Sequence, residues 1–328
     1  MDFEKLRDLL INAGGNVQQG DIVSEKMTSR LKKLGKPSAI ADVVIDTDAF
    51  NEIDDQFAIA YALKLTDVIN VHAFYAAPFI NWHAESPKVG MEKSFDEIHH
   101  IIGLAGCEKY RDLVFHGSDR FLPDEHTPVD SPAVDDLIER GMGRDPDSPL
   151  YVVAIAAITN IASALIKEPR LADRLVVIWH GGTALDWPLC NSFNACQDIA
   201  ATRVVMGSGV PFVMQPGHGV TSKLSTTGPE LDYWLKGKNA LCDYLVNKMK
   251  EEARLWKLPE VWSHPLFDVA ALSWFLQDKR YMDECLRPTP LISYDLHYEF
   301  DPRRHLMRYV YDVNRDQILT DLFRRISY

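Results

Sequence analysis

The chain has 328 residues, of which 46% are hydrophobic and 10% aromatic, a composition typical of a globular protein with a sizeable core. Its 47 acidic and 35 basic residues give a net charge of −12, which argues against nucleic acid as a partner because phosphate binding needs a basic surface. The most apolar stretch, residues 151–166, contains Thr159 and Asn160 and is too short to cross a bilayer, so no membrane span is expected.

The first 40 residues predict a helical extension in front of the main domain. Residues 3–11 and 24–34 have helical spacing, the start of the chain is too charged for a secretory signal, and no motif occurs there. The five cysteines form no C-x-x-C pair, which is typical of reduced thiols in a cytoplasm. We therefore expect a cytoplasmic protein with an extension at 1–40 and one domain at 41–328.

An acidic stretch follows the first predicted strand. Residues 43–45 form a short apolar run typical of a buried strand. Acids then follow within ten residues, and the last two open an amphipathic helix that starts near Ile53; they are Asp46, Asp48, Glu52, Asp54 and Asp55. Carboxylates at one point repel unless a cation joins them. The pattern therefore favours a functional cluster, at the sheet edge where α/β proteins bind ligands, over a solvated turn with helix-capping acids.

The rest of the chain alternates between strand and helix patterns. Apolar runs predict further strands at 68–76, 151–156, 175–179 and 211–214. Helical spacing occurs at 94–104, 133–140, 159–167, 199–206, 229–256 and 266–276. Residues 291–313 alternate as two strands joined at Asp301-Pro302. This order predicts an α/β fold with an open, mostly parallel β-sheet flanked by helices, in a single domain.

Four short motifs, in the same order along the chain, resemble those of the nucleoside hydrolase family of the inosine-uridine preferring type. They are Asp46-Thr47-Asp48 followed by Asp54-Asp55, Ala157-Ile158-Thr159-Asn160, Ser192-Phe193-Asn194 and Leu266-Phe267-Asp268. The first has five residues between its acid pairs where the family usually has three. The resemblance implies a nucleoside-hydrolase-like fold and a homodimer or homotetramer. It also implies hydrolysis of the N-glycosidic bond of ribonucleosides to ribose and a free base.

The resemblance also implies roles for single residues. A Ca²⁺ ion would hold the attacking water and the ribose diol, and Asp48 would activate the water by taking its proton. The implied metal ligands are Asp48, Asp55, Asp268 and the backbone carbonyl of Thr159. Calcium is favoured over zinc because all of these ligands are oxygens. The implied ribose-binding residues are Asp54, Asn194 and Asn81. Asp46 is expected to orient the loop from behind the ligands.

Two positions depart from the family pattern. Phe267 stands where many members have the histidine that protonates the leaving base, and Ser192 replaces a glutamate. His83 and His264 are candidate replacement acids, and Phe267 could bind the substrate by stacking on the base or shaping an apolar pocket. For each of these side chains an ordinary packing or loop-closing role is the alternative.

Two other functions stay open. A nucleoside- or ribose-binding protein could keep the metal site and lack catalysis, given Phe267 and Ser192. A phosphatase of the haloacid-dehalogenase type also carries D-x-D after an apolar strand, but it needs a further acid pair that no later motif supplies.

Overall fold

An eight-stranded sheet forms the centre of the computed structural model, which describes residues 25–278 and 280–328. The strand order is β3-β2-β1-β4-β5-β6-β12-β9, and all neighbours are parallel except β12 and β9. The strands are β1 (Ala41–Thr47), β2 (Ile69–Ala76), β3 (Val114–His116), β4 (Leu150–Ala154), β5 (Leu175–His180), β6 (Phe212–Gln215), β9 (Met282–Pro288) and β12 (Leu306–Val313). The predicted open, mostly parallel sheet is confirmed.

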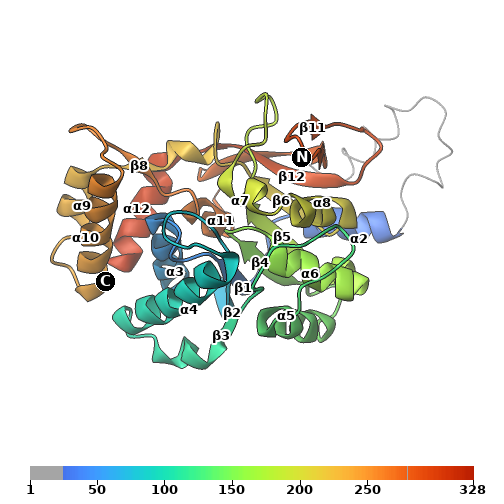
Figure 1. The fold of residues 1–328 in the computed structure, drawn as a ribbon, viewed down its shortest axis with the longest axis horizontal. Helices are drawn as coiled ribbons and strands as arrows, with labels where there is room; N and C mark the ends of the chain where they lie inside the picture. Colours follow the sequence, from blue (N-terminus) through green and yellow to red (C-terminus); the bar gives the residue numbers. More distant parts are fainter. Residues whose placement is uncertain (1–24, 279) are drawn as a thin grey trace.

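Helices cover both faces of this sheet (Figure 1). One layer contains α3 (Ile53–Lys64), α4 (Pro87–Leu104), α10 (Ala240–Leu255), α11 (Val269–Ser273) and α12 (Arg315–Ile326). The other contains α5 (Pro132–Met142), α6 (Thr159–Lys167) and α8 (Ile199–Ser208). Because successive strand side chains point to opposite faces, Val43 and Ile45 of β1 pack in the first layer and Val44 in the second. The apolar run therefore reads as a strand buried on both sides.

Shorter elements connect these layers. The remaining helices are α2 (Glu25–Lys33), α7 (Phe193–Gln197) and α9 (Gly228–Trp234), with 3₁₀ turns η1 (Glu108–Leu113), η2 (Pro169–Asp173) and η3 (Thr221–Lys223). Two small antiparallel pairs are formed by β7 (Ser225–Thr226) with β8 (His264–Pro265), and by β10 (Leu291–Ile292) with β11 (Tyr298–Glu299).

The sequence prediction was wrong about the C-terminal region. Residues 291–313 do not form two strands joined at Asp301-Pro302; they contain the β10–β11 pair and then β12, which pairs with β6 and β9. Strand β9 escaped prediction because its sequence, MDECLRP, mixes acidic, basic and apolar residues. Helix α12 was not predicted either, although Asn314 caps it through the backbone amide of Gln317.

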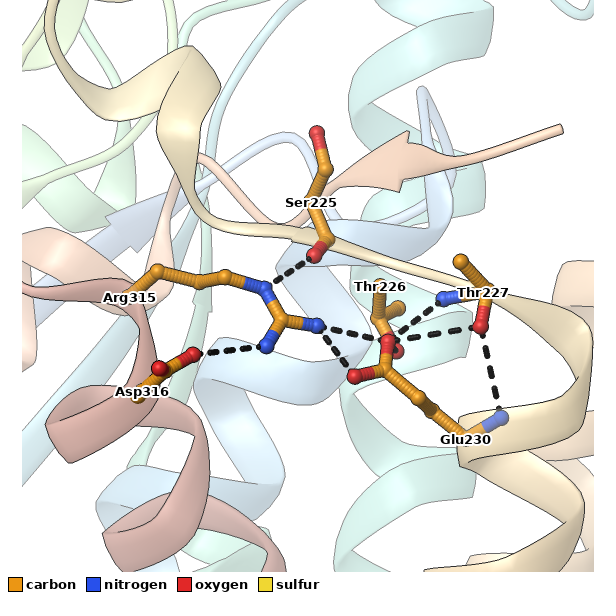
Figure 2. A network of polar contacts seen from close by, with 6 residues as sticks. All are labelled: Ser225, Thr226, Thr227, Glu230, Arg315 and Asp316. Carbon is orange, nitrogen blue, oxygen red and sulfur yellow. Dashed lines mark hydrogen bonds and ion pairs between the residues drawn. The ribbon is translucent and has the colours of Figure 1, made fainter.

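An ion pair ties α12 to the start of α9 (Figure 2). Glu230 and Thr227 form a capping box at the first turn of α9. Arg315 of α12 donates to both carboxylate oxygens of Glu230, at 2.6 Å to Oε2, and through Nε to the carbonyl of Ser225 at 2.8 Å. Ser225 begins β7, which pairs with β8, so this contact helps to place the segment around His264.

The N-terminal prediction is covered only in part. The predicted helix at residues 3–11 lies outside the described residues, and α2 occupies most of the second predicted helix. Leu34, which follows α2, is buried, and Lys33 donates to the carbonyl of Asp173 at 2.6 Å. The division of the chain at residue 40 stays a prediction. In the part of the chain that the structure describes, no helix is long and apolar enough to span a bilayer.

Candidate active site

A cavity of about 300 Å³ opens at the carboxyl edge of the sheet. Residues that end or follow four neighbouring strands line it: Asp48 after β1, Ile155 after β4, His180 at the end of β5 and Gly217 after β6. The opposite wall comes from the segment between α10 and α11, with Trp256, His264 and Phe267. A cavity at this edge is where open α/β sheets bind small molecules.

Three carboxylates converge at one point of this cavity. Ligand oxygens of Asp54, Asp55 and Asp268 all lie within 4.8 Å of one another, and the three residues are buried. Asp54 and Asp55 are in the first turn of α3, and Asp268 directly precedes α11, which packs against α3. The backbone amide of Asp268 donates to Asp54 Oδ2 at 3.4 Å, and the hydroxyl of Thr47 donates to Asp55 Oδ1 at 2.5 Å.

Asp48 lines the same cavity with an unsatisfied carboxylate. Its residue surface is 1% exposed, and neither carboxylate oxygen has a hydrogen-bond partner among the described residues. Burial and repulsion from neighbouring acids raise the pKa of Asp48, Asp55 and Asp268 well above the usual range. A bound cation would remove this repulsion, and a donor set made only of oxygens fits a hard divalent ion. The residues present therefore fit a metal site.

Asp46 lies behind this cluster and does not line the cavity. Asn160 Nδ2 donates to Asp46 Oδ1 at 2.7 Å, and Asn160 Oδ1 in turn accepts hydrogen bonds from the amide and hydroxyl of Ser118, both at 2.8 Å. Burial raises the pKa of Asp46 to about 7. The side chain is thus positioned to fix the loop after β1 from the protein interior.

The structure does not bring Thr159 to the cavity. Thr159 is the first residue of α6, and its hydroxyl donates to Asp198 Oδ2 at 2.8 Å. Ile155, four residues earlier and just past the end of β4, lines the cavity instead. The sequence analysis did not single out Ile155, because an apolar side chain gives no sign that its residue lines a polar cavity. The usable signal was its position at the carboxyl end of a strand next to β1.

Of the two predicted ribose-binding amides, one lines the cavity and the other does not. Asn194 lines the cavity, and its Nδ2 donates to the carbonyl of His180 at 3.0 Å. Asn81 does not line the cavity, but its Nδ2 donates to Oδ1 of Asn51, which does, at 2.7 Å. Ser192 also lines the cavity, and its hydroxyl accepts the Gly182 amide at 2.7 Å.

An aromatic layer forms one side of the cavity around Phe267. The rings of His180 and Phe267 are stacked with centroids 5.5 Å apart, and His218 meets Phe267 edge to face at 6.2 Å. Burial lowers the pKa of His180 to about 3, so its ring is neutral at neutral pH. His180 Nε2 lies 3.9 Å from Asp268 Oδ1. Sequence reasoning gave neither His180 nor Trp256 a role at the site.

The two candidate acids lie in different places. His264 is buried, lines the cavity and contacts Trp256 edge to face at 5.6 Å. Burial raises the pKa of Asp54, and His264 acts in the opposite direction. His83 does not line the cavity; its ring contacts Phe50 at 5.8 Å and Trp82 at 5.4 Å. Trp82 in turn meets Trp256 at 5.2 Å. His264 is therefore the better placed of the two to meet a bound ligand.

Two glutamates extend the acidic surface beyond the predicted cluster. Glu52 lines the cavity, and burial together with Asp54, Glu252 and Asp48 raises its pKa. Glu252 of α10 is 4% exposed, its Oε2 has no partner among the described residues, and burial raises its pKa to about 7. Glu52 belongs to the acidic stretch of the sequence, whereas nothing near Glu252 in the sequence signals its proximity to that stretch.

Comparison with known proteins identifies a family whose model matches most of the chain. Residues 43–317 match the model of the family described as inosine-uridine preferring nucleoside hydrolase. A pyrimidine-specific ribonucleoside hydrolase, RihA of Salmonella enteritidis, is 27% identical over 140 residues, which is 41% of this chain and 44% of that protein. The match thus spans less than half the length of these curated relatives.

Solved structures share the fold over most of the chain. A plant nucleoside hydrolase, PpNRh1, aligns with a TM-score of 0.68 and 18% identity, over 88% of this chain and 99% of that one. A purine-preferring ribonucleoside hydrolase from Gardnerella vaginalis aligns with a TM-score of 0.66 and 20% identity, over 87% and 98%. At these identities the likeness establishes the arrangement of strands and helices and does not extend to the substrate.

Proposed function

The chain belongs to the inosine-uridine preferring nucleoside hydrolase family, and we propose that it hydrolyses the N-glycosidic bond of ribonucleosides to ribose and a free base. The observation that carries this proposal is the convergence of Asp54, Asp55 and Asp268 within 4.8 Å, at a cavity that Asp48 also lines. An acid cluster that lines a cavity suits a reaction in which water attacks a sugar carbon that becomes positively charged.

We propose Asp48, Asp55 and Asp268 as ligands of Ca²⁺. All three are buried carboxylates that repel one another without a cation, and oxygen-only sites favour calcium over zinc. The fourth predicted ligand was the carbonyl of Thr159; the position of Ile155 at the cavity supports the Ile155 carbonyl instead. When bound, a divalent ion supplies positive charge that acidifies water and attracts the vicinal hydroxyls of ribose.

The side chains of the cavity then divide the work of the reaction. A proton passes from the attacking water to a carboxylate oxygen of Asp48, whose oxygens carry no competing hydrogen bond from the described residues. Asp54 accepts hydrogen bonds from the ribose hydroxyls through its carboxylate, and Asn194 binds them through its side-chain amide. The Asp54 carboxylate also favours the positive charge that develops on the sugar. Asp46, held by Asn160, keeps the loop after β1 in place.

For the departing base, we propose His264 as the proton donor and Phe267 as a stacking surface. His264 lines the cavity and is buried, while His83 stands outside it. Phe267 is backed by the stacked ring of His180, which leaves a flat apolar face for a base.

The test is release of reducing sugar from a panel of ribonucleosides, with and without a chelator. Release that stops with chelator supports the hydrolase. Phosphate release from a nucleotide without sugar release would instead point to the phosphatase. Tight nucleoside binding with no turnover of any panel member would mean that the chain is a binding protein. This is the second candidate, because Phe267 and Ser192 depart from the family pattern.

We also propose a cytoplasmic homodimer or homotetramer that does not bind nucleic acid. Its five cysteines are free thiols, as expected in a reducing compartment, and its net charge is −12. Sedimentation velocity of the purified protein tests the oligomeric state.

A further inference from the structure

The lining of the cavity carries more negative charge than one divalent ion balances. Five carboxyl groups line it, and no lysine or arginine is among the described residues that do so. The five are Asp48, Glu52, Asp54, Asp55 and Asp268. Thr47 and the Asp268 amide donate to Asp55 and Asp54, whereas both buried oxygens of Asp48 lack a partner among the described residues. A divalent ion balances the charge of two carboxylates, and a positively charged ligand would favour ionisation of the others.

Among the five lining carboxyls, Glu52 is the one that we assign neither to the metal nor to ribose. It is the N-cap of α3, yet its side chain makes no capping bond. Glu252 approaches it from α10, so the two carboxyls repel each other and Asp54. Lys248 lowers the pKa of Glu252, but its ammonium pairs with Glu251 at 3.4 Å and lies 5.6 Å from the centre of the Phe50 ring.

The wall of the cavity also suits a flat cation. Phe267 and Trp256 both line it, and aromatic faces attract positive charge within about 6 Å of their centres. A base that is already cationic does not need the proton that we assign to His264, because breaking its bond to the sugar leaves a neutral ring.

We propose that this site prefers ribonucleosides whose base bears a fixed positive charge, such as N-ribosylpyridinium or N7-alkylpurine nucleosides, with Glu52 facing that charge. The inference rests on the N-ribohydrolase function proposed above and specifies its substrate class. In the reaction the bond between C1′ and the charged ring nitrogen breaks, and its electron pair neutralises the ring. A water oxygen bonds to C1′, and one proton of that water leaves through Asp48. The reaction therefore consumes a cationic riboside and one water, and it releases ribose, the neutral base and one proton.

The experiment compares two substrate pairs at about pH 6 in the Ca²⁺-loaded protein. One pair is 7-methylguanosine with guanosine, and the other is nicotinamide riboside with uridine. We expect Glu52→Gln to lower the ratio of kcat/KM, cationic over neutral, by about tenfold, as for loss of one charge contact, because a cationic base favours the ionised form of Glu52. Glu139→Gln, which removes an exposed carboxyl on α5, controls for net charge and should leave the ratio within about twofold of wild type.

The direction of the change separates two roles for Glu52. If Glu52 were the proton donor to the base, Glu52→Gln would slow neutral substrates more than cationic ones and the ratio would rise. A rise, or an unchanged ratio, overturns the inference. Trp256→Leu supplies a second variant in case Glu52→Gln does not fold, and it too should lower the ratio.

A binding measurement decides the inference independently of turnover. Calorimetry with 1-methylnicotinamide, a cation, and nicotinamide, its neutral counterpart, should show tighter binding of the cation by the wild type and loss of this difference in Glu52→Gln. Equal binding of both by the wild type overturns the inference. Absence of sugar release from every substrate would instead defeat the proposed hydrolase, and the binding preference would still be measured.

Discussion

Asp48→Asn should separate catalysis from stability in this protein. The substitution keeps the shape of the side chain and removes the carboxylate that we assign as base and metal ligand. General-base catalysis contributes about 10²–10⁴-fold, so kcat for the best nucleoside should fall by about 10³-fold.

The same change should stabilise the metal-free protein. Asp48 is 1% exposed, has two unpartnered oxygens, and is repelled by Asp54 and Asp46. An amide removes that repulsion, and we expect a gain of about 0.5–2 kcal/mol in the free energy of unfolding at pH 7, the range of common stabilising substitutions. Functional sites that store unfavourable charge commonly show this opposition of activity and stability.

The measurements are sugar release at saturating nucleoside and thermal unfolding in chelator. Asp112→Asn, which removes an exposed carboxyl at η1, should change neither quantity appreciably. Wild-type turnover by Asp48→Asn would refute its assignment as the base. A loss of metal-free stability would refute the picture of an uncompensated buried charge.

Three further predictions follow from the same site. Ca²⁺ at about 100 times its dissociation constant should raise the free energy of unfolding by about 2.7 kcal/mol, which is measured as a higher Tm. Chelator should reverse this increase and Asp268→Asn should abolish it, whereas an unchanged Tm counts against a metal site. Metal-free stability should fall as pH rises from 4.5 to 7, because burial raises the pKa of Glu252 to about 7 and the folded carboxyl keeps a proton that the unfolded chain has released. That difference corresponds to about 3 kcal/mol, and Glu252→Gln should flatten the pH profile measured by urea unfolding. His264→Ala should slow hydrolysis of neutral nucleosides at least about tenfold more than His83→Ala does, and the reverse order in steady-state kinetics would restore His83 as the acid.

The sequence was sufficient where a local pattern has one physical outcome. Residues 43–45 predicted a buried strand, and Asp54 and Asp55 predicted the start of a helix after it, so two of the three converging carboxylates could be placed from residues 43–55. That Asp268 lies near these acids was inferred through the resemblance, because nothing in the sequence around residues 266–268 indicates its spatial neighbours.

The remaining features depend on tertiary packing. Ile155 lines the cavity because of its position at the end of β4, which side-chain chemistry does not encode, and the predicted ligand Thr159 lies four residues further along the chain. Glu252 belongs to an amphipathic helix whose inward face was not expected to carry an acid. Strand β9 and helix α12 were missed because charged residues mask the apolar spacing that their packing uses.

The contact between Arg315 and Glu230 bears on how the molecule is assembled during synthesis. Strand β12 fills the position between β6 and β9, and α12 then reaches back to hold the start of α9 (Figure 2). While the ribosome is still adding residues 280–328, a nascent chain exposes β6 as an unpaired edge, which invites association with other chains. A stall or premature stop in this stretch should therefore yield aggregates carrying a nearly complete sheet, and chaperone demand should be highest while this stretch is being synthesised.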